Sequence, residues 1–128
     1  MAKYLFSVRL STGNQAFATK EEYVSFLDGL NTPDSPIDLM WKYNESLKSS
    51  GNLILQDHHL VVQDDTNDFV ISKIFNDQSD ATSYNTWMTE GEGKTLLDAW
   101  MQPIGWKIED IMHRELGDEE FTGIMASI

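Results

Sequence analysis

The chain has 128 residues, and its 21 acidic against 9 basic residues give a formal net charge of −12. This length fits a single domain, and the hydrophobic share of 41% is typical of a globular protein. The excess of acidic residues argues against direct nucleic-acid binding, which needs lysine and arginine at the phosphates, and the absence of cysteine excludes disulfides and thiolate chemistry.

The first part of the chain predicts a strand followed by two helices. Apolar residues recur at every second position over residues 4–10, which indicates a half-buried strand. Residues 19–22 match a capping box, in which the threonine hydroxyl accepts from the backbone and the glutamate reaches back, so a helix is expected over residues 21–30. Ser35-Pro36 suits the start of a second helix, and Gly51 suits its end in the left-handed conformation.

The middle of the chain predicts two strands. Residues 53–63 are expected to be extended, with a kink or tight turn at residues 56–59. Turn-forming residues occupy 64–68, and a second strand is expected over residues 69–75. One face of that strand consists of Phe69, Ile71, Lys73 and Phe75. The pair indicates a hairpin.

The last part predicts two helices and a final strand. A helix begins near residues 76–79 and carries apolar residues as far as Met88, and the glycines at residues 91–93 separate it from a helix over residues 94–101. A strand follows over residues 106–113, with Glu109, Ile111 and His113 on one face. The tail is expected to be either a short docked helix or a disordered end.

This order of elements predicts an α+β fold with a ferredoxin-like β-α-β-β-α-β core. The helices are expected to cover one face of an antiparallel sheet, with two additional helices over residues 21–30 and 94–101. We expect a single domain over residues 1–116 and an acidic, then apolar, tail over residues 117–128. The second sheet face also needs a cover, which predicts a homodimer.

Two segments carry a resemblance to a known group of proteins. They are the helix Trp41–Leu47, which ends at Gly51, and the strand-to-helix passage Ile71–Ser79, which Tyr84–Trp87 follows. Over roughly residues 3–115 the chain resembles the dimeric α/β-barrel superfamily, especially the small antibiotic-biosynthesis monooxygenases and the YCII-like domains. The resemblance implies a ferredoxin-like dimer. The early histidine of the YCII-like pattern is absent, since the first histidine is His58.

The candidates for acid–base chemistry are Asp57, His58, His59 and His113. On a regular strand Asp57 and His59 share a face and could form a carboxylate–imidazole pair, whereas the neighbours His58 and His59 point to opposite faces. In a turn, both histidines would be exposed. We favour a structural or surface role, and we predict no metal and no cofactor, since a metal site needs at least three convergent ligands.

The tryptophans are numerous for this length and suggest a pocket or an interface. The candidate residues are Trp41, Tyr84, Trp87, Trp100 and Trp106. They could line an apolar pocket between sheet and helices, or they could anchor the core and a dimer interface. We favour the second interpretation.

The leading functional hypothesis is a domain without catalysis that acts by self-association and binding, because no phosphate loop, nucleophile elbow or catalytic carboxylate pair is visible. One alternative is a small-molecule enzyme or carrier of the dimeric-barrel type, with an aromatic pocket and a histidine as acid–base. Another is an acidic inhibitor or nucleic-acid mimic that docks on a basic protein. We expect no membrane span and a cytoplasmic location.

Overall fold

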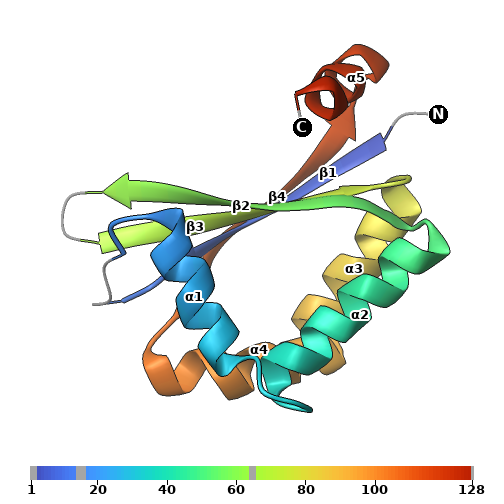
Figure 1. Cartoon of the computed structure of the whole chain (residues 1–128). Helices are drawn as coiled ribbons and strands as arrows, with labels where there is room; N and C mark the ends of the chain where they lie inside the picture. The colour runs from blue at the N-terminus through green and yellow to red at the C-terminus, as the bar shows by residue number, and fades with distance from the viewer. Residues whose placement is uncertain (1–2, 14–16, 64–65, 128) are drawn as a thin grey trace.

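A computed structural model describes residues 3–13, 17–63 and 66–127 of the chain. The elements follow the predicted order (Figure 1). They are β1 (Lys3–Ser11), α1 (Lys20–Leu30), α2 (Pro36–Ser50), β2 (Leu53–Gln63), β3 (Thr66–Phe75), α3 (Gln78–Glu90), α4 (Glu92–Met101), the 3₁₀ turn η1 (Gln102–Ile104), β4 (Lys107–Leu116) and α5 (Asp118–Ala126).

The strands form one antiparallel sheet in the order β2-β3-β1-β4. Helices α1 to α4 lie on one side of this sheet, while α5 lies on the other side, beyond one end of β1 and β4 (Figure 1). The order is that of the ferredoxin-like split motif. The structure therefore confirms the predicted α+β fold, including the two additional helices α1 and α4.

Local capping signals set the helix boundaries. The Thr19 hydroxyl accepts from the backbone N–H of Glu22 at 3.2 Å, and the Glu22 carboxylate accepts at 2.8 Å from the N–H of Ala18, one residue before the predicted partner. Gly51 ends α2 in the left-handed region with φ of 85°. The Asp77 side chain caps α3 by accepting from the backbone N–H of Asp80. These caps satisfy groups that a helix end leaves unpaired.

Two predicted features of the loops and strands differ from the structure. The expected kink at residues 56–59 is wrong, because β2 runs through them and its register shift lies between Leu53 and Leu55. The predicted turn over residues 64–68 is too long, since β3 already begins at Thr66, and residues 64–65 lie outside the described residues. The turn-forming residues 11–14 also predict that the first strand ends there, and Asn14 lies outside the described residues. Cross-strand pairing extends strands into segments whose composition favours turns.

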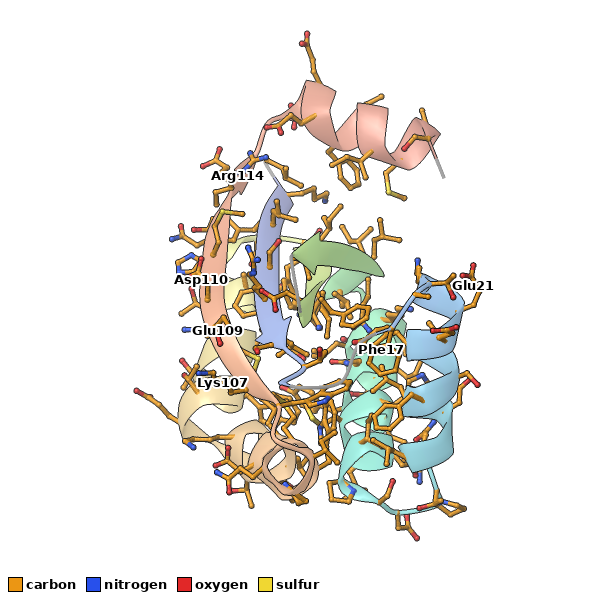
Figure 2. The ribbon with its side chains drawn as sticks, turned by 90° about the vertical axis from the view of Figure 1, so that its left-hand side faces the viewer. Phe17, Glu21, Lys107, Glu109, Asp110 and Arg114 are labelled. Atoms are coloured by element: carbon orange, nitrogen blue, oxygen red, sulfur yellow. The ribbon has the colours of Figure 1, made fainter. Side chains whose placement is uncertain are left out.

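The face assignment of the last strand is also corrected. Arg9 pairs with Asp110 but Leu10 pairs with Ile108, so Glu109 is an extra residue at a β-bulge. A bulge exchanges the two faces beyond it, and Ile108 and Ile111 both pack against the core. The alternation predicted that Glu109 would lie on the same face as Ile111. Because of the bulge it does not. Figure 2 shows the charged residues of this edge strand, which protect it from pairing with other chains: Lys107, Glu109, Asp110 and Arg114.

The core between sheet and helices contains two aromatic clusters. In one, the Tyr23 ring of α1 stacks on Phe69 of β3 with 3.5 Å between ring centroids, and Trp106 and Phe17 pack beside them. Figure 2 shows Phe17 next to α1. In the other, Tyr84 of α3 contacts the rings of the sheet residues Phe6 and Phe75. Edge-to-face and stacked rings of this kind fix the helices against the sheet.

The face of the sheet opposite the core is partly open. Helix α5 is held to this face by a bidentate ion pair between Arg114 and Glu120, with N–O distances of 3.0 and 2.9 Å. A cation–π contact between the Lys3 amine and the Phe121 ring adds to it. Farther along, Met112 is 49% exposed. None of the helices in the described ranges is long and apolar enough to cross a membrane.

Candidate functional site

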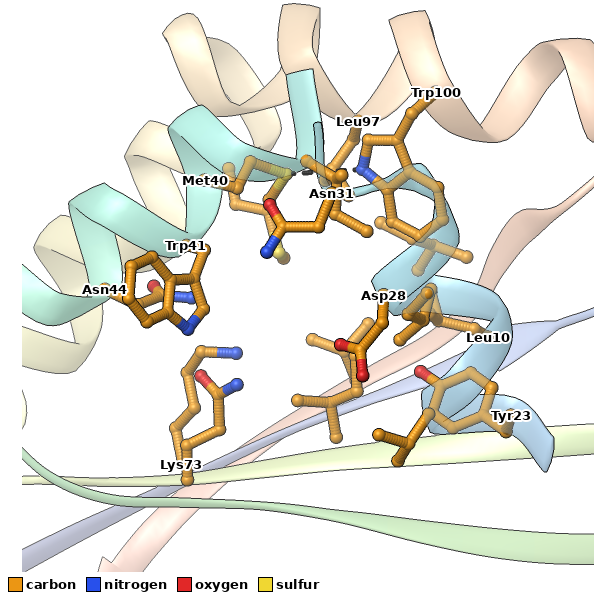
Figure 3. Close-up of a pocket in the computed structure, with 18 of the residues that line it drawn as sticks. Leu10, Tyr23, Asp28, Asn31, Met40, Trp41, Asn44, Lys73, Leu97 and Trp100 are labelled. Atoms are coloured by element: carbon orange, nitrogen blue, oxygen red, sulfur yellow. Dashed lines mark hydrogen bonds between the residues drawn. The ribbon is translucent and has the colours of Figure 1, made fainter. Parts of the chain in front are cut away.

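A cavity of about 340 Å³ lies between the helix-covered face of the sheet and helices α1 to α4 (Figure 3). Most of its wall is apolar, because each surrounding element turns its apolar side inward. Contributing residues from the sheet and the helices include Val8, Leu10, Ile71, Met40, Leu97 and Trp100. An apolar cavity of about 150 Å³ holds a benzene molecule. This one therefore has room for about two fused rings.

Lys73 lies on the floor of the cavity, with its amine turned inward (Figure 3). It occupies the core face of β3, in line with Ile71 and Phe75, and is 4% exposed. Its Nζ lies 5.0 Å from the centroid of the Tyr84 ring, in a cation–π position. Burial lowers the pKa of the Lys73 amine from 10.5 to about 7, because an apolar environment disfavours the charged form. The amine therefore titrates near neutral pH.

Polar groups gather at this end of the cavity. Gln56 lies opposite Lys73 in the β2–β3 register, and Asn44 reaches in from α2. The Asn44 amide donates to the Tyr84 hydroxyl, and burial raises the pKa of Tyr84 above its ordinary range. The Asn44 Oδ1 atom is buried and has no hydrogen-bond partner among the described residues. The cavity thus has mostly apolar walls, a buried polar end at Lys73, and further polar residues on the α1 side, namely Lys20, Asp28 and Asn31. A mostly apolar site with a few polar groups is usual for small-molecule binding.

The cavity opens toward solvent between α1 and α2. Trp41 of α2 is 53% exposed at this opening, although it is a large apolar residue. Asp28 of α1 lies across the cavity from Lys73 in Figure 3. At the far wall the indole N–H of Trp100 donates to the Met40 sulfur at 3.5 Å, which holds α4 against α2. A ligand could therefore enter past Trp41 without unfolding a helix.

The histidine candidates are not brought together with these groups. His113 is exposed on β4, and its Nδ1 lies 3.2 Å from the Tyr4 hydroxyl, away from the cavity lining. The backbone register of β2 and β3 places Asp57 opposite Ser72, His58 opposite Ile71 and His59 opposite Val70. The side chains of residues 57–59 lie outside the described residues. Among the residues that the structure describes, no three His, Asp or Glu side chains lie close enough to hold a metal ion.

The aromatic candidates divide between cavity and core. Trp41, Tyr84 and Trp100 line the cavity. Trp87 instead stacks on Tyr43 with 3.8 Å between ring centroids, and Trp106 is 2% exposed within the core.

Sequence reasoning missed Lys73. The sequence pattern could have indicated it, since Lys73 is the charged residue on a strand face that is otherwise formed by Phe69, Ile71 and Phe75. A lysine at such a position is rarely buried without a functional or electrostatic reason.

Comparison with solved structures supports the fold. A dimeric ferredoxin-like protein from an uncultured marine organism aligns with a TM-score of 0.52 and 15% identity, over 91% of this chain and 96% of that one. A protein from Deinococcus radiodurans, with a proposed role as an antibiotic biosynthesis monooxygenase, aligns with a TM-score of 0.51 and 13% identity, over 89% and 93% of the two chains. No protein-family model matches the sequence, and no curated protein is significantly similar to it.

These structural matches confirm the predicted likeness to dimeric ferredoxin-like proteins and to a structure of the antibiotic-monooxygenase type. At such low identity the likeness defines the fold and leaves the function to be argued from the site.

Proposed function

We propose that this domain binds a small, mostly apolar molecule in the cavity between its sheet and helices. The observation that carries the proposal is the cavity of about 340 Å³ with the buried Lys73 at its polar end. Both features cost stability, because larger side chains would fill the cavity and an apolar residue would avoid desolvating an amine. Features that cost stability are typical of binding sites. The proposal is therefore binding or carriage, with no reaction assigned.

A neutral fluorescent probe tests this proposal. We expect 1-naphthylamine, a neutral dye of two fused rings, to bind saturably, with one molecule per chain, and to quench tryptophan emission, since Trp41 and Trp100 line the cavity. The variant Ile71→Trp fills the cavity from β3 and is expected to weaken binding at least about tenfold, since an occupied site cannot accept the rings. Fluorescence titration measures both constants.

A matched variant controls for the added indole. Met112→Trp places the same side chain on the opposite sheet face, where Met112 is 49% exposed, and is expected to leave probe binding unchanged. Equal affinity of the wild type and Ile71→Trp, with both folded by circular dichroism, would contradict the proposal.

We also infer that two copies pair through the open sheet face. The supporting observation is that α1 to α4 all cover the other face, which leaves the exposed Met112 and the half-buried Leu5 and Val70 uncovered by them. The similar marine protein is described as dimeric. Pairing would remove this apolar surface from water, which is the main driving force of association.

The substitution Met112→Glu tests the pairing. In a symmetric dimer it would place two carboxylates at the interface without disturbing the separate chain, because Met112 is exposed there. We expect sedimentation to give twice the chain mass of 14.6 kDa for the wild type and the mass of one chain for the variant. Leu39→Glu on α2, which is 38% exposed, is the control expected to stay dimeric. A wild-type mass of one chain at micromolar concentration would exclude the dimer.

A further inference from the structure

The Lys73 amine lacks an anionic partner among the described residues. No carboxylate oxygen of these residues lies within the 4.0 Å of an ion pair, and burial alone lowers its pKa. Elsewhere in the chain the lysines pair readily, as Lys42 does with Asp38 at 2.9 Å. A buried cation without a partner is costly, so the fold leaves a position where a negative charge would be favourable.

The groups that face the amine from the neighbouring elements are neutral. Phe6 of β1 and Gln56 of β2 pair with Lys73 across the sheet, and α3 contributes the Tyr84 ring at 5.0 Å. Tyr84 keeps its proton, since burial raises its pKa. From α2, Asn44 adds an amide. None of these four groups supplies the missing charge.

Charged groups of the cavity wall come from α1. Asp28 and Lys20 line the cavity there, together with Tyr23, whose pKa burial also raises. Asp28 is exposed and forms no ion pair with Lys73. The His58 side chain, on the neighbouring strand, lies outside the described residues. The chain's net charge of −12 acts on ligands only at long range, and physiological salt screens it within about 8 Å.

We propose that the cavity takes a compact ligand of apolar rings with one carboxylate, and that this carboxylate pairs with the ammonium form of Lys73. The inference rests on the proposed function, since it assigns the ligand class for the same cavity. The ligand carboxylate supplies the negative charge that no described residue places beside Lys73. An ion pair in apolar surroundings is stronger than one in water. The apolar walls contact the rings.

The neutral amine could instead add to a carbonyl compound, with loss of water to form an imine. The cavity favours the carboxylate over this reaction. Dehydration needs an acid beside the amine. Tyr84, whose ring centroid lies 5.0 Å from the Lys73 amine, has a raised pKa that makes it a poor proton donor.

Two probes of equal shape test the inference. We expect 2-naphthoate to bind wild-type protein at about pH 6 at least about tenfold more tightly than 2-naphthamide, because only the carboxylate forms a charge-assisted bond with the Lys73 ammonium. The carboxylate stays ionised while free Lys73 loses its proton near pH 7, so naphthoate affinity falls at higher pH. Naphthamide affinity stays constant. Calorimetric titration measures both.

Two lysine variants identify the group responsible. Lys73→Met is expected to bind both probes equally, whereas Lys42→Met, which removes the same charge from an exposed site on α2, keeps the preference for naphthoate. Equal affinities in the wild type would overturn the inference and leave the proposed function standing. Failure of both probes and of the neutral dye would overturn the two together. Borohydride trapping of 2-naphthaldehyde on Lys73, without a preference for naphthoate, would replace pairing with covalent capture.

Discussion

Replacing Lys73 with methionine is expected to raise the free energy of unfolding of the ligand-free protein by about 4 kcal/mol at pH 7. The reason is that folding carries the amine from water, where its pKa is 10.5, into a cavity floor where it is about 7. Each unit of that difference corresponds to about 1.4 kcal/mol. Methionine has a similar length and no charge to desolvate, so the cost disappears without a large change in packing.

The pH dependence fixes the sign of this effect. The folded pKa lies below the unfolded one, so between pH 7 and 10.5 the unfolded chain binds the additional proton and stability rises with pH. The advantage of Lys73→Met is therefore complete below pH 7 and vanishes near pH 10.5. Urea unfolding of both proteins across this range measures the difference.

The variant Lys42→Met is the control. Lys42 is exposed and its pKa is raised by hydrogen bonds to Asp38 and Asp34, so its removal should slightly lower stability. A Lys73→Met protein that is less stable than the wild type at pH 7 would mean that the amine has a partner in solution.

The second large effect is expected from Gly93→Ala, which should lower the free energy of unfolding by about 2 kcal/mol through overpacking. A Cβ atom at Gly93 would lie 2.5 Å from the Trp87 ring. That ring stacks on Tyr43 at 3.8 Å and cannot withdraw freely. Because Tyr43 in turn contacts Tyr84, the displacement should reach the polar end of the cavity. Urea unfolding and near-ultraviolet circular dichroism measure the two consequences.

Gly29→Ala is the matched control, since nothing lies within 4 Å of a Cβ atom at Gly29 in α1. Alanine is the better helix former, so this variant should be as stable as the wild type or more stable by up to about 1 kcal/mol. Equal effects of the two substitutions would show that the Trp87 contact does not carry the cost.

The sequence by itself determined the elements and most of their ends. Capping residues such as Thr19 and Asp77 act on backbone groups within three residues, and Gly51 supplies a left-handed residue directly after its helix. Alternation on β3 also placed Phe69, Ile71, Lys73 and Phe75 on one face, because side-chain direction in a strand follows from backbone geometry. From these local facts the ferredoxin-like order followed, and the structural matches agree with it.

Only the tertiary structure decided what these elements do together. The bulge at Glu109 depends on how β4 pairs with β1, and the continuity of β2 depends on its pairing with β3. Whether Lys73 meets a carboxylate depends on which side chains α1, α2 and α3 bring to it from distant positions in the chain. The alternation on β3 predicts that Lys73 lies on the face turned toward the core. Only the packed helices determine that its amine faces a mostly apolar cavity with no described carboxylate within ion-pair distance, which is what makes it the candidate binding group.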